Sequence, residues 1–288
     1  MIHKYISQLW LLLFLLFACN STAKKSIHLK DSSTSDREYQ LVWSDEFNGT
    51  GLPDSFKWKY DTEGNSVGWG NKELQEYTIA KKTNTWVENG LLTITARKEK
   101  AGGKEYTSAR LDSKESWLYG KIEVRAKLPN GRGTWPAIWM MPKDWSFNDG
   151  NWPNIGEIDI MEHVGHNPGV IHASAHSADY QWQIGTQKTA AITISDFSET
   201  FHSYIWEWTP QLMRAYVDDQ LYFEYKNEGL GELKWPYTKP FYLILNVAVG
   251  GAWGNEKGID EDSFPQNMLI DYVRIYQKKK NEDFFVSK

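Results

Sequence analysis

Strict alternation between charged and apolar residues runs through several segments of this 288-residue chain. Residues 121–128 alternate without a break, and residues 92–97 repeat the pattern. Successive side chains on a strand point to opposite faces, so each of these segments has one buried face and one solvated face. Residues 241–249 are apolar except for Asn246, which suits a strand that is covered on both faces.

The rest of the pattern also favours antiparallel sheet. Residues 215–223 have the pattern of a hairpin with a polar turn, and residues 271–276 that of a closing strand. The sequence contains no long amphipathic pattern of helical period and no internal repeat. The turn signals that separate the segments include Asn48-Gly49, Asn89-Gly90, Asn130-Gly131 and Gly250-Gly251. Together these features predict one all-β domain, built as a sandwich of two sheets.

The N-terminus has the pattern of a targeting segment. Lys4 supplies positive charge, and residues 9–17 form an apolar run that is too short to span a bilayer. The run ends in Leu16-Phe17-Ala18-Cys19, which resembles a bacterial lipoprotein signal. We therefore expect residues 1–18 to be cleaved and Cys19 to be acylated, so that lipid anchors the protein to a membrane. The alternative is an ordinary secretory signal.

The composition of the rest of the chain predicts a tether, a folded domain and a short tail. Residues 19–37 carry Cys19 and a Ser-, Thr- and Lys-rich stretch without aromatic residues, which is typical of a flexible tether. We expect residues 38–278 to form the folded domain and residues 279–288 to form a polar tail. Cys19 is the single cysteine, so an internal disulfide is excluded. The net charge of −5 and the lack of a long basic block argue against nucleic acid as a partner.

Three acidic residues, Glu157, Asp159 and Glu162, fall within six positions of an otherwise apolar strand. Alternation places Glu157 and Asp159 on one face, whereas Glu162 has the opposite parity. A single-residue β-bulge between Asp159 and Glu162 would return Glu162 to that face. Without the bulge, Met161 would point into the site and Glu162 would enter the core as an unpaired carboxylate, which is energetically costly. We therefore predict a bulge.

Like charges on one face raise the pKa of at least one of the three carboxyls. Glycosidases use such an arrangement, with one carboxylate ionised as nucleophile and a second carboxyl protonated as acid. Retaining enzymes hold that pair about 5–5.5 Å apart. Four strand steps span ~13 Å between Cα atoms, so a strongly concave sheet is needed to close the gap. An exposed acidic strand edge and a calcium site are the alternative interpretations.

The segment 156–163, GEIDIMEH, closely resembles the signature of family 16 glycoside hydrolases. The six-residue form EIDIME is typical of laminarinase-like β-1,3-glucanases. The resemblance covers about residues 40–277, nearly the whole mature domain. The other segments that match in family order are WSDEFNG at 43–49, NKELQEYT at 71–78, YTSAR at 106–110, GTWPAIWM at 133–140, LNVAVGG at 245–251 and DYVRIY at 271–276.

This resemblance implies a fold and a mechanism. The fold is a β-jelly-roll sandwich of two curved antiparallel sheets, of the concanavalin-A-like kind, with an open cleft across the concave face. Glu157 is assigned as the nucleophile and Glu162 as the acid/base. Asp159 is assigned a place between them, hydrogen-bonded to Glu157. The reaction is hydrolysis with retention of configuration, and no metal or organic cofactor takes part in the chemistry.

Tryptophan occurs 15 times, which indicates either a bulky core or an aromatic-lined surface. Trp135 and Trp139 are four positions apart and share one strand face. Core packing is the default for an isolated tryptophan, but the family resemblance implies that both line the cleft under sugar rings. It implies the same for Trp253, which follows a glycine pair. Trp206 and Trp208 also share a face, and we expect them in the core.

Arg110 and Asn71 are candidate ligands for sugar hydroxyls. The guanidinium of Arg110 offers a fork of donors, and the amide of Asn71 both donates and accepts. The family resemblance favours sugar binding for Arg110, and the alternative is a surface salt bridge. For Asn71 the alternative is a role as a turn residue.

Two histidines, His172 and His176, share a strand face. They stand about 13 Å apart along the strand, too far to hold one metal ion together. The resemblance implies a place for His176 beside Glu162, near the leaving-group subsite. We expect His172 to be structural. His163 has the opposite parity to the acid/base, which predicts a place in the core.

The resemblance also implies one structural calcium ion on the convex face, remote from catalysis. The matching positions are Glu46, the carbonyl of Gly90 and Asp271. Oxygen-only ligands suit calcium. An ion there would join the N- and C-terminal strands and stabilise the fold. The alternative for Asp271 is a structural hydrogen-bond acceptor.

The sequence thus predicts a monomeric endo-glycosidase that hydrolyses β-1,3-glucan of the laminarin type, with mixed β-1,3/1,4-glucan as a further substrate. We expect export and a lipid anchor at the outer membrane or cell surface; secretion is the alternative. Rival enzymes within the family are a mixed-linkage-specific glucanase, an agarase and a carrageenase. Outside the enzyme class, the rival is a non-catalytic glucan-binding surface protein, which has no need of both Glu157 and Glu162.

Overall fold

The computed structural model describes residues 38–147 and 151–279. The predicted signal peptide, the lipidation site Cys19, the tether up to residue 37 and the tail from residue 280 lie outside the described residues. Within the described ranges, no helix is long and apolar enough to cross a membrane.

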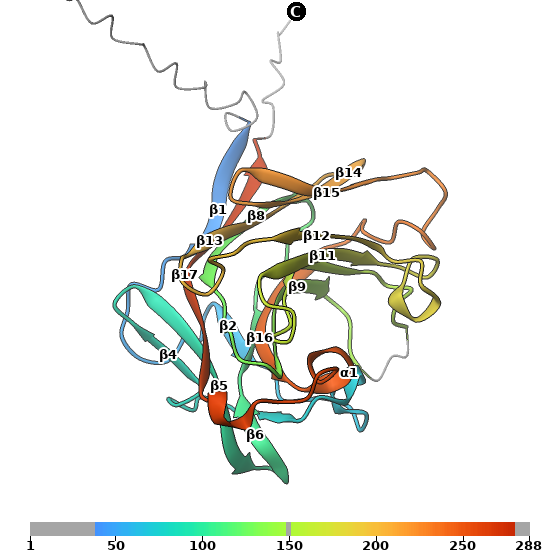
Figure 1. Ribbon diagram of the computed structural model, residues 1–288. Coiled ribbons are helices and arrows are strands. Elements are labelled where there is room, and N and C mark those ends of the chain that lie inside the picture. The colour runs from blue at the N-terminus through green and yellow to red at the C-terminus, as the bar shows by residue number, and fades with distance from the viewer. Residues whose placement is uncertain (1–37, 148–150, 280–288) are drawn as a thin grey trace, which may run out of the picture. The chain divides into compact units, whose positions relative to one another are not determined.

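Two β-sheets form the domain, one packed on the other (Figure 1). The strands of the larger sheet are β1 (Tyr39–Asp45), β3 (Gln75–Tyr77), β4 (Thr85–Glu88), β5 (Leu91–Ala101), β6 (Lys104–Ser108), β8 (Gly120–Lys127), β13 (His202–Trp208), β14 (Leu212–Val217), β15 (Gln220–Lys226) and β17 (Gln266–Lys278). The strands of the smaller sheet are β2 (Trp58–Tyr60), β7 (Arg110–Ser113), β9 (Thr134–Pro142), β10 (Glu157–Glu162), β11 (Val170–His176), β12 (Lys188–Thr193) and β16 (Phe241–Val249).

Strand order places the acidic strand near the middle of the smaller sheet, in the order β12-β11-β10-β9-β16-β7-β2. All pairings in this sheet are antiparallel. In the larger sheet, the pairing of β3 with β6 is parallel. The two-layer architecture confirms the predicted all-β jelly-roll sandwich.

The alternation that predicted the strands is visible in their burial. Side chains of β8 are buried at every second position, and those of β13 follow the same period. All nine residues of β16 are buried, as expected for a strand covered on both faces. Trp206 and Trp208 on β13 are at most 1% exposed, which confirms the prediction that they pack the core. Each large apolar side chain buried in this way contributes ~1.5–3 kcal/mol to stability.

The first and last strands of the domain lie side by side. In Figure 1, β1 in blue runs along β17 in red, and the two pair in antiparallel register from Tyr39 with Lys278 to Asp45 with Val273. The pairing ties the two ends of the domain together through main-chain hydrogen bonds, because both strands belong to one sheet.

The described helices are all short. They are a π-helical turn η1 (Gly68–Lys72), two 3₁₀ turns η2 (Trp182–Ile184) and η3 (Glu261–Ser263), and α1 (Gly251–Gly254). Gly250 and Gly251 turn the chain from β16 into α1 with φ of 72° and 77°, a region that favours glycine. A Cβ at Gly250 would lie 2.7 Å from the side chain of Leu74, which would have to shift to make room.

Candidate active site

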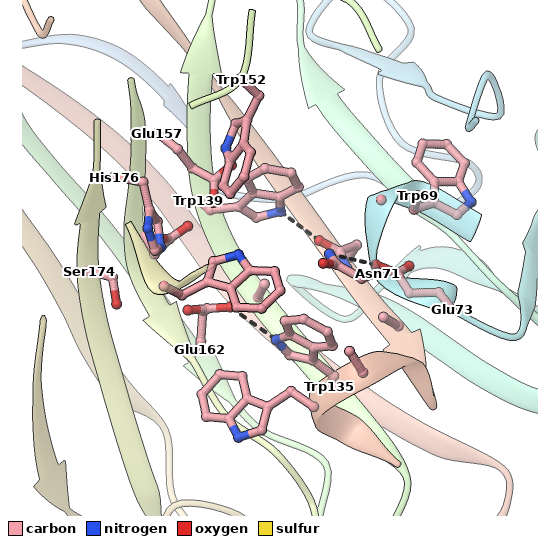
Figure 2. A pocket seen from close by; sticks show the side chains of 18 of the residues that line it. Trp69, Asn71, Glu73, Trp135, Trp139, Trp152, Glu157, Glu162, Ser174 and His176 are labelled. Carbon is pink, nitrogen blue, oxygen red and sulfur yellow. Dashed lines mark hydrogen bonds and ion pairs between the residues drawn. The ribbon is translucent and has the colours of Figure 1, made fainter. Parts of the chain in front are cut away.

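A cleft of about 740 Å³ runs over the smaller sheet. Strands β9, β10 and β11 supply much of its surface, and the turns η1 and η2 with α1 add residues at its rim. Figure 2 shows tryptophan side chains gathered around the carboxylates inside it. The predicted site residues that line the cleft are Asn71, Trp135, Trp139, Glu157, Asp159, Glu162, His176 and Trp253.

The predicted β-bulge is present in β10. Pairing with β11 shifts register between Asp159 and Glu162, and pairing with β9 shifts between Asp159 and Met161. As a result Glu157, Asp159 and Glu162 all face the cleft. Met161 is fully buried instead. The bulge thus keeps the carboxylate of Glu162 out of the core, where it would be unpaired and costly, as the sequence predicted.

The residue before Glu157 is a glycine for a steric reason. Gly156 has a φ of 86°, and a Cβ there would lie 2.9 Å from Pro236 and 3.1 Å from the ring of Tyr237. The chain can therefore enter β10 at this angle only without a side chain at position 156. This entry sets the place of Glu157 at the start of the strand.

Each of the two glutamates receives a hydrogen bond from an indole. Nε1 of Trp152 donates to Oε2 of Glu157 at 2.9 Å, and Nε1 of Trp135 donates to Oε1 of Glu162 at 3.0 Å (Figure 2). One carboxylate oxygen on each glutamate is thereby fixed by a neutral donor. Such a donor orients the carboxylate without cancelling its charge.

Asp159 lies deeper than the glutamates and is 3% exposed. Its Oδ2 is 3.2 Å from Nε2 of His176. Among the described residues, Glu157, Asp159 and His176 form a group whose potential metal-ligand atoms lie within 4.8 Å of one another. Any ion held there would engage the same carboxylates that face the cleft.

Burial raises the pKa of all three carboxyls above their ordinary values. For Glu157 and Glu162, the neighbouring charge of Asp159 raises the pKa further, whereas His176 acts in the opposite direction. The cleft therefore favours protonation of at least one of these carboxyls near neutral pH. A protonated acid beside an ionised carboxylate is what glycoside cleavage requires.

The residues at the floor of the cleft are joined by a chain of hydrogen bonds that begins at Trp139. Its Nε1 donates to Oδ1 of Asn246 at 2.7 Å, and Nδ2 of Asn246 donates to the hydroxyl of Tyr77 at 2.9 Å. The Tyr77 hydroxyl donates to Glu73 at 3.3 Å, and Nε2 of Gln75 donates to the same oxygen at 2.7 Å. These bonds fix the orientation of the Trp139 indole under the cleft.

Arg110 does not contact the cleft, which corrects the expectation that it binds sugar directly. The residue is 2% exposed, and its Nε lies 3.1 Å from Asp61 and 3.5 Å from Asp112. Its guanidinium carbon lies 4.9 Å from the ring centre of Trp69 and 4.8 Å from that of Trp139. Arg110 therefore supports the aromatic floor from below through cation–π contacts.

The histidines are arranged differently from the prediction. His176 lies opposite Glu157 in the pairing of β10 with β11 and contacts Asp159, and its charge also acts on Glu162. The cross-strand partner of Glu162 is His172. The bulge places His172 there, because uninterrupted pairing from Glu157 and His176 would put Ile171 opposite Glu162.

His172 lines the cleft, although the sequence indicated a structural role. Its ring centre lies 5.0 Å from that of Trp253, edge to face, and burial lowers its pKa. His163 is fully buried beside Phe197, at 4.6 Å between ring centres, which confirms the core position predicted for it. Trp253 lies on α1, and its ring centre is 5.6 Å from that of Trp135.

Several residues that line the cleft were not predicted from the sequence. Glu73, Trp69 and Trp152 all line the cleft, and so does Trp182 on η2. Glu73 stands in the segment NKELQEYT and has the strand parity of Tyr77, which is a signal that could have identified it. The other three lie in short turns outside the strands, where no periodicity indicates the direction of a side chain.

The carboxylates expected to bind calcium each have an arginine partner. Arg274 donates to both oxygens of Glu46, at 2.9 and 2.8 Å, and this contact lowers the pKa of Glu46. Asp271 pairs with Arg125. A cation at this position would compete with these two partly exposed ion pairs for the carboxylates.

Two indole-bound glutamates with an aspartate between them, facing a cleft on a two-layer β-sandwich, match the paired carboxylates that glycoside hydrolases use. Comparison with known proteins agrees with this class. The family model described as glycosyl hydrolases family 16 matches residues 73–274. The chain belongs to this family.

Individual relatives match over most of their length. A beta-glucanase from Rhodothermus marinus is 50% identical over 254 residues, which cover 86% of this chain and 88% of the relative. The crystal structure of a laminarinase from Rhodothermus marinus is 49% identical and has a TM-score of 0.80, covering 84% of this chain and 98% of that one. A non-specific endo-β-1,3(4)-glucanase of family 16 is 47% identical, has a TM-score of 0.79, and covers 84% and 92%.

Proposed function

We propose that this enzyme hydrolyses internal bonds of β-1,3-glucan of the laminarin type, and that it also accepts mixed β-1,3/1,4-glucan. The observation that carries the proposal is the set of three acids on β10, which faces an open cleft lined with indole rings. The names of the relatives, a beta-glucanase, a laminarinase and an endo-β-1,3(4)-glucanase, support the substrate class.

The electrostatics of the cleft favour a neutral substrate. Among its described lining residues there is no lysine and no arginine, and the guanidinium of Arg110, which contacts Trp139, is buried and paired with carboxylates. Sulfated galactans would require cationic partners for their sulfate groups. A neutral glucan requires stacking surfaces and hydrogen-bonding groups, and the cleft has both.

In the first step, Glu162 protonates the glycosidic oxygen while Glu157 attacks C1 of the sugar. The C1–O bond to the leaving chain breaks, and an ester forms between C1 and Glu157 through an oxocarbenium-like transition state. Trp152 holds the second oxygen of Glu157, so the attacking oxygen keeps its orientation. Trp135 does the same for Glu162.

In the second step, Glu162 takes a proton from water, and the resulting hydroxide attacks C1. The bond between C1 and Glu157 breaks, and the sugar leaves with its original configuration. Asp159 raises the pKa of Glu162 and so helps to keep the acid protonated for the first step. His176, paired with Asp159, offsets part of that charge.

The location of the enzyme is a separate proposal. The lipoprotein-like segment that ends in Cys19 supports an exported, lipid-anchored enzyme at the outer membrane or cell surface, and we expect a monomer. Replacing Cys19 by Ser should release the activity from membranes into the soluble fraction. Activity that stays on the membrane after this change would contradict the anchor.

Product analysis on three glucans tests the substrate. Purified enzyme is incubated with laminarin, curdlan and lichenan, and the products are separated by length. We expect a ladder of oligosaccharides from laminarin, because an endo-acting enzyme cleaves internal bonds, and a slower release from lichenan. The Glu157→Ser variant serves as the control for contaminating activity. No release of reducing ends from any β-1,3-linked glucan would contradict the proposal.

A further inference from the structure

An exposed indole stands at the end of the cleft formed by the β11–β12 connection. Trp182 lies on η2, is 50% exposed and lines the cleft together with Gln183 and Gln187. Exposing half of an indole to water is unfavourable, since apolar surface remains hydrated. The reaction described above does not involve the side chain of Trp182.

The loop that carries Trp182 is held by its own hydrogen bonds. The main-chain N–H of Ser177 donates to the carbonyl of Tyr180 at 2.7 Å, and the hydroxyl of Thr186 donates to the carbonyl of Asp179 at 2.7 Å. The N–H of Gly185 donates to the carbonyl of Trp182 at 3.0 Å. The indole is therefore presented by a defined turn, which reduces the entropy lost when a ligand binds.

Trp182 differs from the other cleft tryptophans in its contacts. Trp139 has the guanidinium of Arg110 on one side, and the ring of Trp135 packs against that of Trp253. Among the described residues, no aromatic ring packs on Trp182, so its face is available to a ligand. Sugar rings present apolar C–H surfaces, and an indole face is a suitable partner for them.

Strand order places this indole across the catalytic strand from Asn71. Strand β12, which follows the loop, is two strands from β10 on one side, whereas β9 and β16 lie on the other. The turn η1, which carries Trp69 and ends at Lys72, adjoins the β16 side, because Glu73 forms a β-bridge with Gly250. The acids of β10 therefore lie between two ends of the cleft.

We propose that Trp182 forms a further glucose-binding subsite at the β12 end of the cleft, with the amides of Gln183 and Gln187 as partners for sugar hydroxyls. Amides both donate and accept, as hydroxyl recognition requires. The subsite sets the preference of the enzyme for long chains over short ones. The proposal rests on the proposed glucanase function, and the test separates the two.

The test compares Trp182→Ala with Ile184→Ala. Ile184 belongs to the same turn, is 61% exposed and is not among the residues that line the cleft, so it controls for damage to the loop. The measurement is kcat/KM on laminarin, on laminarihexaose and on laminaritriose. We expect Trp182→Ala to lower kcat/KM on the two longer substrates by about 10-fold, through KM, as for loss of one aromatic contact residue. The loss should shrink for the trisaccharide.

Trp182→Phe should recover part of the activity on long chains, because a smaller aromatic face remains. Ile184→Ala should behave as the parent enzyme on every substrate. Equal effects of Trp182→Ala on all chain lengths, or equal effects of Trp182→Ala and Ile184→Ala, would overturn the subsite. A parent enzyme that cleaves none of these glucans would overturn the proposed function instead.

Discussion

Two groups of buried charge lie around the same cleft, and their environments differ. On β10, Glu157 and Glu162 receive neutral indole hydrogen bonds, and Asp159 faces the imidazole of His176. Under the floor, Arg110 stands between two aspartates, at 3.1 Å from Asp61 and 3.5 Å from Asp112. The first group keeps an excess of negative charge, and the second is compensated at close range.

The difference explains which group can do chemistry. Uncompensated carboxylates in a partly dry site have raised pKa values, so one can be protonated while another is ionised. Arg110 has no such freedom, because its charge is engaged by its partners and its planar face by Trp69 and Trp139. Its contribution is to the geometry of the floor. The following predictions test this contrast, beginning with the largest effect.

Removing the nucleophile should abolish turnover and leave the fold intact. We expect Glu157→Ser to lower kcat by about 10⁴-fold or more, since the covalent step is lost. The variant should melt no lower than the parent, because it removes one of three mutually repelling carboxyls. Steady-state kinetics and thermal unfolding check the two parts. Turnover at the parent rate would show that Glu157 is not the nucleophile.

Replacing Arg110 should lower the free energy of unfolding and have a smaller effect on turnover. Arg110→Met removes the guanidinium from beside Asp61 and Asp112 and leaves Asp112 with Lys59, at 3.4 Å, as its cationic partner. Loss of one side of a buried pair costs about 3–5 kcal/mol. The matched control is Arg214→Met, whose partner Glu224 lies 2.9 Å away at the surface, where a pair contributes roughly 0–1 kcal/mol. Urea unfolding measures both. Equal destabilisation by the two changes would contradict the structural role of Arg110.

Much of the fold and of the arrangement of the three acids could be predicted from the sequence. Alternation in residues 121–128 and 241–249 identified the strands, and the parity of Glu162 required the bulge in β10. These predictions succeed because a strand has a fixed period and burial of an unpaired charge is costly. The sequence also identified Trp135 and Trp139 as residues of one face.

The environment of Arg110 could not be predicted in this way. Its partner Asp61 is 49 positions away in the chain, and Trp69 lies in an irregular turn, so no local period relates them. The same holds for Trp152 and Trp182, which reach the cleft from loops. The pairing of His172 with Glu162 was not predicted, because the bulge adds a residue that alternation does not count.

Glu73 is a buried carboxyl outside both groups, and it should make the free energy of unfolding depend on pH. Burial raises its pKa to about 7, although Gln75 and Tyr77 donate hydrogen bonds to it. The unfolded chain releases this proton near pH 4.3, so the folded state binds more protons between pH ~4 and ~7. The free energy of unfolding therefore falls as pH rises through that window.

Glu73→Gln removes this contribution. From pH 5 to pH 8, the variant should lose less stability than the parent, by roughly 2–4 kcal/mol. The carboxyls of β10 titrate in both proteins and cancel in the difference. Urea unfolding at the two pH values measures it. A parallel loss of stability in parent and variant would contradict a raised pKa for Glu73.

Chelation should have the smallest effect. Glu46 is bound by both donors of Arg274, and Asp271 is paired with Arg125, so these carboxylates are already compensated without calcium. We expect EDTA to leave the melting temperature of the enzyme unchanged. A clear fall that added calcium reverses would restore the metal site implied by the family resemblance.

The most direct test is to trap the covalent intermediate. A laminaribioside with fluorine at C2 and a good leaving group at C1 should form the ester quickly and hydrolyse slowly, because the fluorine destabilises the oxocarbenium-like transition state. Mass spectrometry of the protein and its peptides then locates the sugar. The predicted result is one sugar adduct per chain, on Glu157. An adduct on Asp159 or Glu162, or turnover with no adduct at all, would contradict the assignment of the nucleophile.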